Sequence, residues 1–417
     1  ALSDYIIATG DISILEEQVP YKQRDKSFKF TTEEFTIFEH IKKQMLYIEN
    51  SLIKGTYLPC YGDGDWDDTL QPKSPEGRKS MVSGWTAELL YETLTKFSTI
   101  IKEYNVEYYN YLNNFAKGLK KDYEKYIIKD NIAAGFIKFE GEKIQYLLHP
   151  DDQITNIKYR LLPINRGIIS ELFTIEQINM GINIINQNLR CEDGIRLMDK
   201  PANYEEGFNH LFQRAEQAST VGREVGLQYV HAHIRFIQAM AHIGKKSEVL
   251  QGLNKINPLD LDLFVKKAKY KQRNTYFSSS EGDFKTRYEY AKDFNKLKDG
   301  TIPIKSGWRI YSSGPGIYMN QLITNFLGIK IQNNYINFDP CIEDRYSGLE
   351  LKYDLLGYST KIIYQAEQKV ELVVNGEFVQ IEYTINKYKD KNIKITKDKL
   401  IKYLKKDQEN VIMIKLS

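Results

Sequence analysis

The spacing of apolar residues changes lastingly from helical to β-rich near residue 330 of this chain of 417 residues, and that change constrains its fold more than any other feature. Up to about residue 330, apolar residues recur at helical intervals in several segments. From about Asn333, short runs such as G-L-E-L-K-Y and V-E-L-V-V-N-G-E-F-V are β-rich and separated by Asn-Gly and Gly turns. We therefore expect a mostly α chain with an appended β-domain of the sandwich type, divided into residues 1–330 and 331–417.

Local signals predict where several elements begin and end. Thr31 and Glu34 form a possible capping box for a helix over residues 35–52, and Thr174 with Gln177 forms another for a helix that ends near Leu189. A change to alternation predicts a hairpin within residues 133–150. Further helices are expected over about 83–104, 106–128, 226–243, 247–256, 317–327 and 398–406, and a last strand over V-I-M-I-K-L.

An unusual acidic stretch, T-Y-L-P-C-Y-G-D-G-D-W-D-D-T-L-Q, occupies residues 56–71. It places four carboxylates within six residues around one indole: Asp63, Asp65, Asp67 and Asp68 around Trp66. Like charges so close together destabilise a loop unless one carboxyl keeps a proton, a cation lies among them, or most of them face water. The stretch is therefore the strongest candidate for a functional site.

Three interpretations of the acidic stretch remain open from the residues alone. A carboxyl with a raised pKa beside an indole suits general acid catalysis on a sugar. The spacing of Asp63, Asp65 and Asp67 also suits a calcium loop, but position 6 would be Asp68 in place of glycine, and position 12 would be Ser74 in place of glutamate. A solvated turn without chemistry is the third possibility.

Composition excludes some classes of partner. The formal net charge is +3 with abundant charges of both signs, so we expect neither nucleic acid nor a membrane as a partner. No apolar run approaches the ~20 residues of a membrane span, and no signal peptide is recognisable. The cysteines, Cys60, Cys191 and Cys341, are odd in number and far apart, which favours neither a disulfide framework nor a zinc site. We expect a cytoplasmic protein.

The segment G-D-W-D-D-T-L resembles the D-W-N-D signature of inverting sugar phosphorylases that act on β-linked sugars, the cellobiose and chitobiose phosphorylase family. The resemblance implies that Asp68 is the general acid and that Trp66 lines the subsite of the transferred sugar. The asparagine of the family signature is Asp67 in this chain.

A second segment, G-R-E-V-G-L-Q-Y-V-H, resembles the family pattern G-x-[RK]-E-N-x-G-x-x-x-H. It implies that His231 binds phosphate, that Arg223 faces the acceptor sugar and that Glu224 braces the site, whereas Val225 replaces the asparagine of the family. From the residues alone, a lone histidine is as readily a buried structural one. His231 and His233 would point to opposite faces of a helix, so they would not chelate one metal ion.

A third segment, S-G-W-R-I-Y-S-S-G-P-G-I-Y, resembles the family pattern W-R-T-G-T-[AG]-G-W-M-Y. The resemblance implies phosphate contacts from Ser313 and Gly314, or from Ser312 if the local alignment shifts by one residue. A Ser/Gly turn that opens a helix can hold an anion, and it can equally be an ordinary helix cap.

Together the segments extend the resemblance over nearly the whole chain and imply part of an (α/α)6 toroid followed by a β-sandwich. In the family, an arginine and an aspartate from an upstream barrel loop also hold the transferred sugar, and the 417 residues of this chain contain no such segment. We therefore expect the C-terminal part of a longer protein, incomplete without its N-terminal portion or a partner chain. Members of the family are commonly homodimers.

The block D-W-D-D-T-L-Q-P followed by S-G-W-T-A looks most like the branch that acts on β-1,2-linked glucose oligomers. The resemblance implies reversible phosphorolysis to α-glucose 1-phosphate, with phosphate as co-substrate and with neither a metal nor another cofactor. Such a reaction needs one carboxyl acid, because phosphate is already an anionic nucleophile. Two alternatives remain: hydrolysis with Glu224 as base, and a non-catalytic carbohydrate-binding or scaffold protein.

Overall fold

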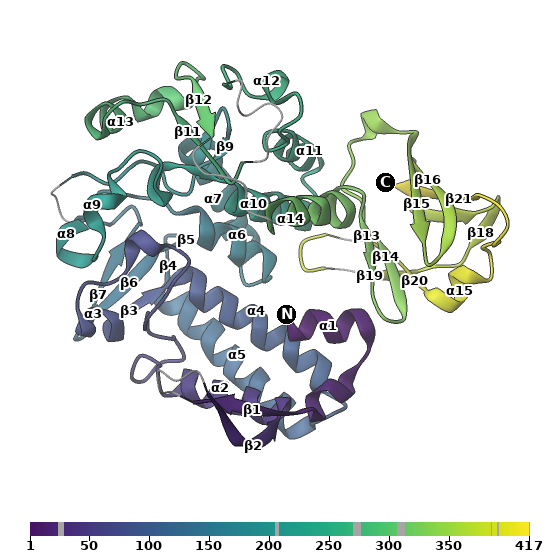
Figure 1. Ribbon diagram of the computed structural model, residues 1–417, viewed down its shortest axis with the longest axis horizontal. Helices are drawn as coiled ribbons and strands as arrows, with labels where there is room; N and C mark the ends of the chain where they lie inside the picture. The colour runs from purple at the N-terminus through teal and green to yellow at the C-terminus, as the bar shows by residue number, and fades with distance from the viewer. Residues whose placement is uncertain are drawn as a thin grey trace.

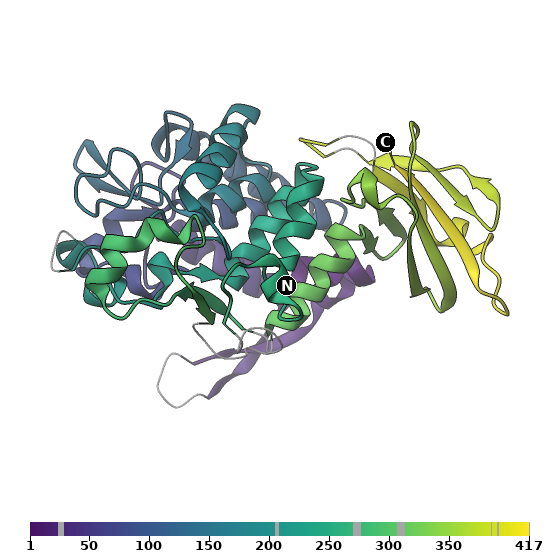
Figure 2. The same ribbon diagram turned by 90° about the horizontal axis from the view of Figure 1, so that it is seen from above.

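A computed structural model shows a helical region beside a β-rich region near the C-terminus (Figure 1). The structure describes residues 1–23, 29–204, 208–269, 277–306, 313–384, 386–389 and 392–416; within them, the side chains of Asp68, Phe208, Asn209, Ala215, Ser306 and Ser313 are outside the description. Seen from above, the two regions lie side by side along the longest axis (Figure 2). This arrangement of helices followed by sheets agrees with the mostly α fold with appended β that the sequence predicts.

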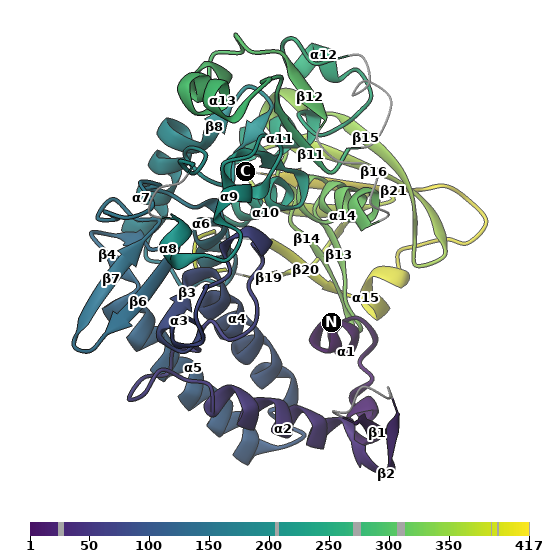
Figure 3. The same ribbon diagram turned by 60° about the vertical axis from the view of Figure 1, so that its left-hand side comes forward.

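The helical region is built from helices that pack along one another. Its longer helices are α1 (Leu2–Thr9), α2 (Ile37–Glu49), α4 (Gly84–Ile101), α5 (Val106–Tyr126), α6 (Leu161–Ile169), α7 (Ile175–Ile184), α10 (Val230–His242), α11 (Lys246–Asn254) and α14 (Ser313–Gln321). Helix α4 packs against α5 and α6, and α10 packs against α6, α11 and α14 (Figure 3). Short helices are α3 (Pro75–Ser80), α8 (Phe208–Leu211), α9 (Ala215–Ala218), α12 (Leu261–Phe264) and α13 (Arg287–Asp293).

Three predicted helices form close to their expected positions because their start signals are used. The Ser83 side chain accepts the amide of Thr86 at the start of α4, and that of Asn105 accepts the amide of Tyr108 at the start of α5. Thr174 and Gln177 form the predicted capping box of α7. Beyond α7 the helix widens to a π-helical turn over Ile185–Leu189, so the predicted end is also confirmed.

The predicted start of the helix over residues 35–52 is wrong. Residues Phe30–Thr36 form strand β2, which pairs with β1 (Gln18–Lys22), so Thr31 and Glu34 lie in a strand. The capping box is instead formed by Thr36 and Glu39, which exchange backbone-to-side-chain hydrogen bonds of 2.8 and 3.1 Å at the start of α2. Two successive T-x-x-E patterns were available, and strand pairing with β1 selects the second.

Sequence reasoning missed α6, which contains Pro163. This proline lies in the first turn of the helix, where the backbone N–H groups have no helical acceptor, so its missing donor costs little. The helix expected from residue 226 begins at Val230, because Glu224–Gly226 form a 3-10 turn and β10 (Gln228–Tyr229) pairs with β11 (Ser279–Gly282). Strand β11 also pairs with β12 (Ile304–Ser306).

The predicted hairpin within residues 133–150 is confirmed. Strands β6 (Phe136–Glu140) and β7 (Lys143–Leu147) pair antiparallel, and β3 (Met81–Ser83) pairs with the other edge of β6. Phe136 and Leu147 face each other across this hairpin and are fully buried. The small sheet thus joins the chain after the acidic stretch to the helical core.

The β-rich region contains two sheets. The first has the order β13-β14-β20-β19 and the second the order β15-β16-β21-β17-β18. Their strands are β13 (Ile329–Ile331), β14 (Tyr335–Phe338), β15 (Leu349–Leu355), β16 (Tyr358–Ala366), β17 (Glu371–Val374), β18 (Glu377–Val379), β19 (Glu382–Thr384), β20 (Asn392–Thr396) and β21 (Asn410–Leu416). The predicted Asn-Gly turn joins β17 to β18, with both of its residues at positive φ. The predicted helix and closing strand are α15 (Lys397–Ile401) and β21.

Among the described residues, none of the helices combines the length and the apolar character that crossing a membrane requires.

Candidate functional site

The acidic stretch runs between two fixed points of the fold. At its start the Tyr61 amide donates to the Met81 carbonyl at 2.6 Å, which ties the stretch to β3. At its end the Gln213 amide donates to Gln71 and the Lys73 amide donates to Leu211, each at 2.8 Å. Residues Asp68–Leu70 form a 3-10 turn between these points, and this turn contacts the turn Glu224–Gly226.

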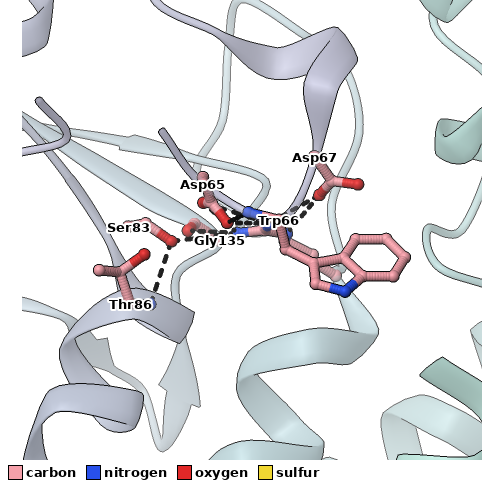
Figure 4. Close-up of polar contacts among 7 residues, drawn as sticks. Asp65, Trp66, Asp67, Ser83, Thr86 and Gly135 are labelled. Atoms are coloured by element: carbon pink, nitrogen blue, oxygen red, sulfur yellow. Dashed lines mark hydrogen bonds and ion pairs between the residues drawn. The ribbon is translucent and has the colours of Figure 1, made fainter. Parts of the chain in front are cut away.

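A buried arginine holds the centre of the acidic stretch. The Arg160 guanidinium donates to Asp67 Oδ2 at 3.0 Å from Nε and at 2.6 Å from Nη2, and to both oxygens of Asp65 at 3.2–3.3 Å. The side chains of all three residues are fully buried. Figure 4 shows Asp65 and Asp67 at opposite ends of this set of contacts.

Arg160 is positioned by rigid elements. It precedes α6 directly, and its guanidinium lies over the Phe136 ring of β6 at 4.6 Å from the ring centroid. Its Nη1 also donates to Ser83 Oγ at 3.3 Å and to the Gly135 carbonyl at 3.4 Å. Charged hydrogen bonds from a planar guanidinium fix orientation as well as distance.

The described acidic side chains of the stretch are divided between two arginine partners. Asp63 is exposed and forms an ion pair of 2.8 Å with Arg78, whereas Asp65 and Asp67 turn to Arg160. Among the described residues, no group of His, Cys, Asp or Glu side chains could hold a metal ion. The described carboxylates therefore have arginine partners in place of the calcium ion that their spacing also suited.

Trp66 points away from the arginine side of the loop. In Figure 4 its indole lies on the side opposite to Asp65, Ser83 and Gly135. The indole meets the Tyr229 ring edge-on at 4.9 Å between centroids, and it lies 6.5 Å from the His231 ring. The structure thus brings Trp66 and His231, two residues predicted for the site, next to each other.

The pKa of Asp67 is raised to about 6. Burial is the largest cause, the charges of Asp65 and Glu224 add to the rise, and the charge of Arg160 opposes it. Asp67 Oδ1 and Glu224 Oε2 are buried and have no hydrogen-bond partner among the described residues. Two unpartnered carboxylate oxygens at one site require donors, which sugar hydroxyls or a retained proton can supply.

The segment with Arg223 and Glu224 is shaped by a glycine. Gly222 has φ +82°, and a Cβ there would lie 2.4 Å from Glu281 Oε2. Arg223 is partly exposed and makes no ion pair with the described residues, whereas Glu224 is buried. Val225, which replaces the asparagine of the family pattern, is fully buried in the apolar core.

His231 lies in the first turn of α10, as predicted, and is half-buried. Burial lowers its pKa, and the positive charges of Arg235 and Arg166 lower it further. His231 is therefore a neutral ring beside two cations, which is a suitable environment for an anion.

The neighbouring histidines have structural roles. His233 is buried: its Nδ1 accepts the Ile195 amide at 3.2 Å, and its Nε2 lies 3.0 Å from the Gly252 carbonyl. Burial lowers the pKa of His233 to about 4. His242 pairs with Glu171 at 3.1 Å. His231 and His233 thus have different surroundings, as their spacing on a helix predicts.

Three residues predicted for the site lie wholly or partly outside the part of the chain that the structure describes. The side chains of Asp68 and Ser313, and the whole of Ser312, lie outside the described residues. The backbone of Asp68 begins the 3-10 turn next to Asp67, and Ser313 and Gly314 begin α14, which packs against α10. Gly314 is buried. The turn at Asp68 thus contacts the turn at Glu224, and α14 packs against the helix that carries His231.

Arg160 is the site residue that sequence reasoning missed. No motif marks it, because it lies 93 residues after Asp67 in the chain. The available signal was the acidic stretch itself, which required a cation, proton or water to offset its charge.

Comparison with known proteins identifies the family. Residues 1–277 match the family described as glycosyl hydrolase 94 superfamily, catalytic domain. This chain belongs to that superfamily. Residues 328–413 match the family described as glycoside phosphorylase C-terminal domain.

Three relatives are phosphorylases by name. The chain is 44% identical over 390 residues to a 1,2-beta-oligoglucan phosphorylase of Listeria innocua, a match that covers 93% of this chain and 35% of that protein. It is 29% identical to a solabiose phosphorylase of Paenibacillus borealis over 24% of this chain and 12% of that one. It is 26% identical to a cellobionic acid phosphorylase of Neurospora crassa, with 59% and 29% covered. The chain thus spans about a third or less of the length of these relatives.

Proposed function

We propose that the protein containing this chain is an inverting phosphorylase that cleaves β-linked gluco-oligosaccharides with phosphate and releases α-glucose 1-phosphate. The contact between Trp66 and His231 is the observation that carries this proposal, because it joins the acidic loop to the basic face of α10. β-1,2-linked glucose oligomers are the proposed substrates, supported by the name of the relative that is 44% identical.

The charges around Trp66 differ on its two sides. The loop side contains Asp65 and Asp67 with Arg160 between them, and Glu224 close enough to raise the pKa of Asp67, whereas the α10 side contains His231 with the cations that lower its pKa. A phosphorylase needs an acid at one end of the scissile bond and an anion site at the other, on opposite faces of the sugar. The arrangement supports this division of roles.

The proposed reaction breaks one bond and forms one. Asp68 gives its proton to the glycosidic oxygen, and the bond from that oxygen to the anomeric carbon breaks. A phosphate oxygen, held by His231, Ser313 and Gly314, attacks the anomeric carbon from the opposite face. Trp66 lines the subsite of the transferred glucose, Arg223 faces the acceptor sugar, and Glu224 braces the site. In the synthetic direction Asp68 takes the proton back.

Further proposals concern architecture. The packed helices support part of an (α/α)6 toroid over residues 1–330, and the two sheets support a β-sandwich over residues 331–417, with β13 starting just before that boundary. The greater length of the relatives supports an N-terminal portion, or a partner chain, that completes the sugar subsite. Assembly as a homodimer is also part of the proposal.

The test uses the whole protein with β-1,2-, β-1,3- and β-1,4-linked glucose oligomers, with and without phosphate. Glucose 1-phosphate that forms only with phosphate, forms fastest from the β-1,2 series and disappears in Asp68→Asn would support the proposal. Free glucose formed equally without phosphate would indicate a hydrolase. Sugar binding without turnover in any buffer would indicate a binding protein, and either result would overturn the proposed reaction.

A further inference from the structure

The arginine beneath the acidic loop has two features that a simple counter-ion does not need. Its guanidinium contacts residues 65 and 67, which flank Trp66 on both sides, and it leaves the indole between them free to face His231. Among the described residues, its hydrogen-bond partners are the two carboxylates of this loop, Ser83 of the small sheet and the neighbouring Gly135 carbonyl.

We propose that Arg160 is a positioning residue of the phosphorolysis reaction, which fixes the backbone of residues 65–67 and so orients Trp66 and the turn that begins at Asp68. This inference rests on the proposed function. Arg160 touches neither sugar nor phosphate in this assignment, and it acts through the loop.

The local backbone explains how two contacts orient three residues. Asp67 has extended backbone, with φ −88° and ψ 104°. Trp66 lies at a bend between the two bound residues, so the contacts of Asp65 and Asp67 with Arg160 hold the backbone on both sides of it. The Trp66 amide also donates to the Asp65 carboxylate, which adds a third constraint on the same peptide. The indole direction is thus fixed by the arginine behind it.

Stability alone is a weak reason to keep such a cluster. A buried ion pair gains little net stability over apolar residues of similar size, because three charges have lost their water. Here the cost is visible in Asp67, whose pKa burial raises to about 6 in spite of Arg160. What the cluster provides is a single geometry, since a guanidinium with several charged hydrogen bonds accepts few alternative placements.

The support behind Arg160 is rigid. Its guanidinium lies on Phe136, a fully buried residue of the paired strand β6, and its own backbone directly precedes α6. A site is held best when its supporting residues are themselves locked by packing and hydrogen bonds. Position errors of about 1 Å at a reacting group can cost roughly 100-fold in rate. Arg160 therefore connects the centre of the loop to the sheet and α6, in addition to the backbone hydrogen bonds that tie its two ends.

The experiment compares the unaltered whole protein with Arg160→Ala in phosphorolysis of β-1,2-linked glucose oligomers. We expect kcat to fall by roughly 100-fold while KM for phosphate changes less than about threefold, because the anion site lies on α10. Guanidinium at millimolar concentration should restore part of kcat in the variant and leave the unaltered enzyme unchanged, with sodium chloride at equal ionic strength as the control. Arg78→Ala is the matched variant: it removes the exposed ion pair of the same loop and should retain kcat.

A second variant separates positioning from folding, since Arg160→Ala leaves two buried carboxylates without a counter-charge. The triple variant Arg160→Met, Asp65→Asn and Asp67→Asn removes all three charges, so its melting temperature should be near that of the unaltered protein. Its kcat should nevertheless be as low as that of Arg160→Ala. If it melts normally and turns over at the unaltered rate, Arg160 has no positioning role. An unaltered protein that forms no sugar phosphate would overturn the proposed function and this inference with it.

Discussion

Asp67 accepts two hydrogen bonds from Arg160, although 93 residues separate them along the chain. The pair connects the acidic loop to the start of α6, and Phe136 beneath the guanidinium adds the small sheet to the same unit. The loop that carries the predicted acid is therefore held by tertiary contacts of the core.

The raised pKa of Asp67 predicts a pH-dependent stability. Burial raises its pKa to about 6, from 3.8 in an unfolded chain, so between about pH 4 and 6 the folded protein binds more protons than the unfolded chain. The contribution of this group to stability therefore rises as the pH falls through 6, by on the order of 3 kcal/mol in full. Asp67→Asn removes that dependence, and melting temperatures from pH 5 to 8 should show the variant gaining on the unaltered protein as the pH rises. Parallel curves would contradict the assignment.

The lowered pKa of His233 predicts that its contribution to stability changes with pH in the opposite direction over the same range. Burial lowers its pKa to about 4, so below about pH 6.5 the unfolded chain binds more protons and stability falls as the pH falls. Glutamine can still donate to the Gly252 carbonyl and does not titrate. The melting temperature of the unaltered protein should therefore fall more between pH 7 and pH 5 than that of His233→Gln. A variant that loses as much would show that His233 is not the group responsible.

His231 predicts a selective effect on phosphate. A hydrogen bond from its ring to an anion contributes about 1.5–3 kcal/mol, so His231→Ala should raise KM for phosphate roughly 10- to 100-fold. KM for the glucan should change much less. Steady-state kinetics with each substrate varied in turn measure both values, and an equal rise in the two would argue against a phosphate contact. His242→Gln, on the same helix but paired with Glu171, is the control.

The left-handed backbone of Gly222 predicts that a larger residue there destabilises the protein. Gly222→Ala adds a Cβ 2.4 Å from Glu281 Oε2 at a φ of +82° and should destabilise the protein by about 1–2 kcal/mol, with loss of activity through Arg223 and Glu224. Gly64→Ala adds a Cβ that meets nothing within 4 Å and should be close to neutral. Melting temperature and turnover of the two variants test the contrast. Equal effects would show that the strain at Gly222 is relieved by movement of Glu281.

Sequence reasoning predicted elements whose signals are local. The starts of α4, α5 and α7 depend on Ser83, Asn105 and Thr174, each within one turn of the amide that it accepts. It failed where a distant partner decides: strand pairing between β1 and β2 placed Thr31 outside the helix. Sequence reasoning also predicted no helix at α6, where Pro163 lies in the first turn, a position that tolerates proline.

In the site, too, residues with local sequence signals were predicted and a residue placed by the fold was missed. Trp66 and His231 were predicted from short segments, and the structure brings them together. Arg160 could not be selected among 58 lysine and arginine residues, because only the fold places it under the loop. The roles of Asp68, Arg223, Glu224, Ser313 and Gly314 remain predictions that the kinetic experiments address.

Strand β21 lies between β16 and β17, pairing parallel with the first and antiparallel with the second. Strands β16 and β17 follow each other along the chain, yet they do not pair with each other. This sheet cannot be assembled by adding each new strand to the previous one as the ribosome releases it. Its earlier strands must wait, with their inner edges unpaired, until Asn410–Leu416 have been synthesised, and during that interval they are open to pairing with other chains. The nascent sheet would therefore be most prone to aggregation just before β21 emerges.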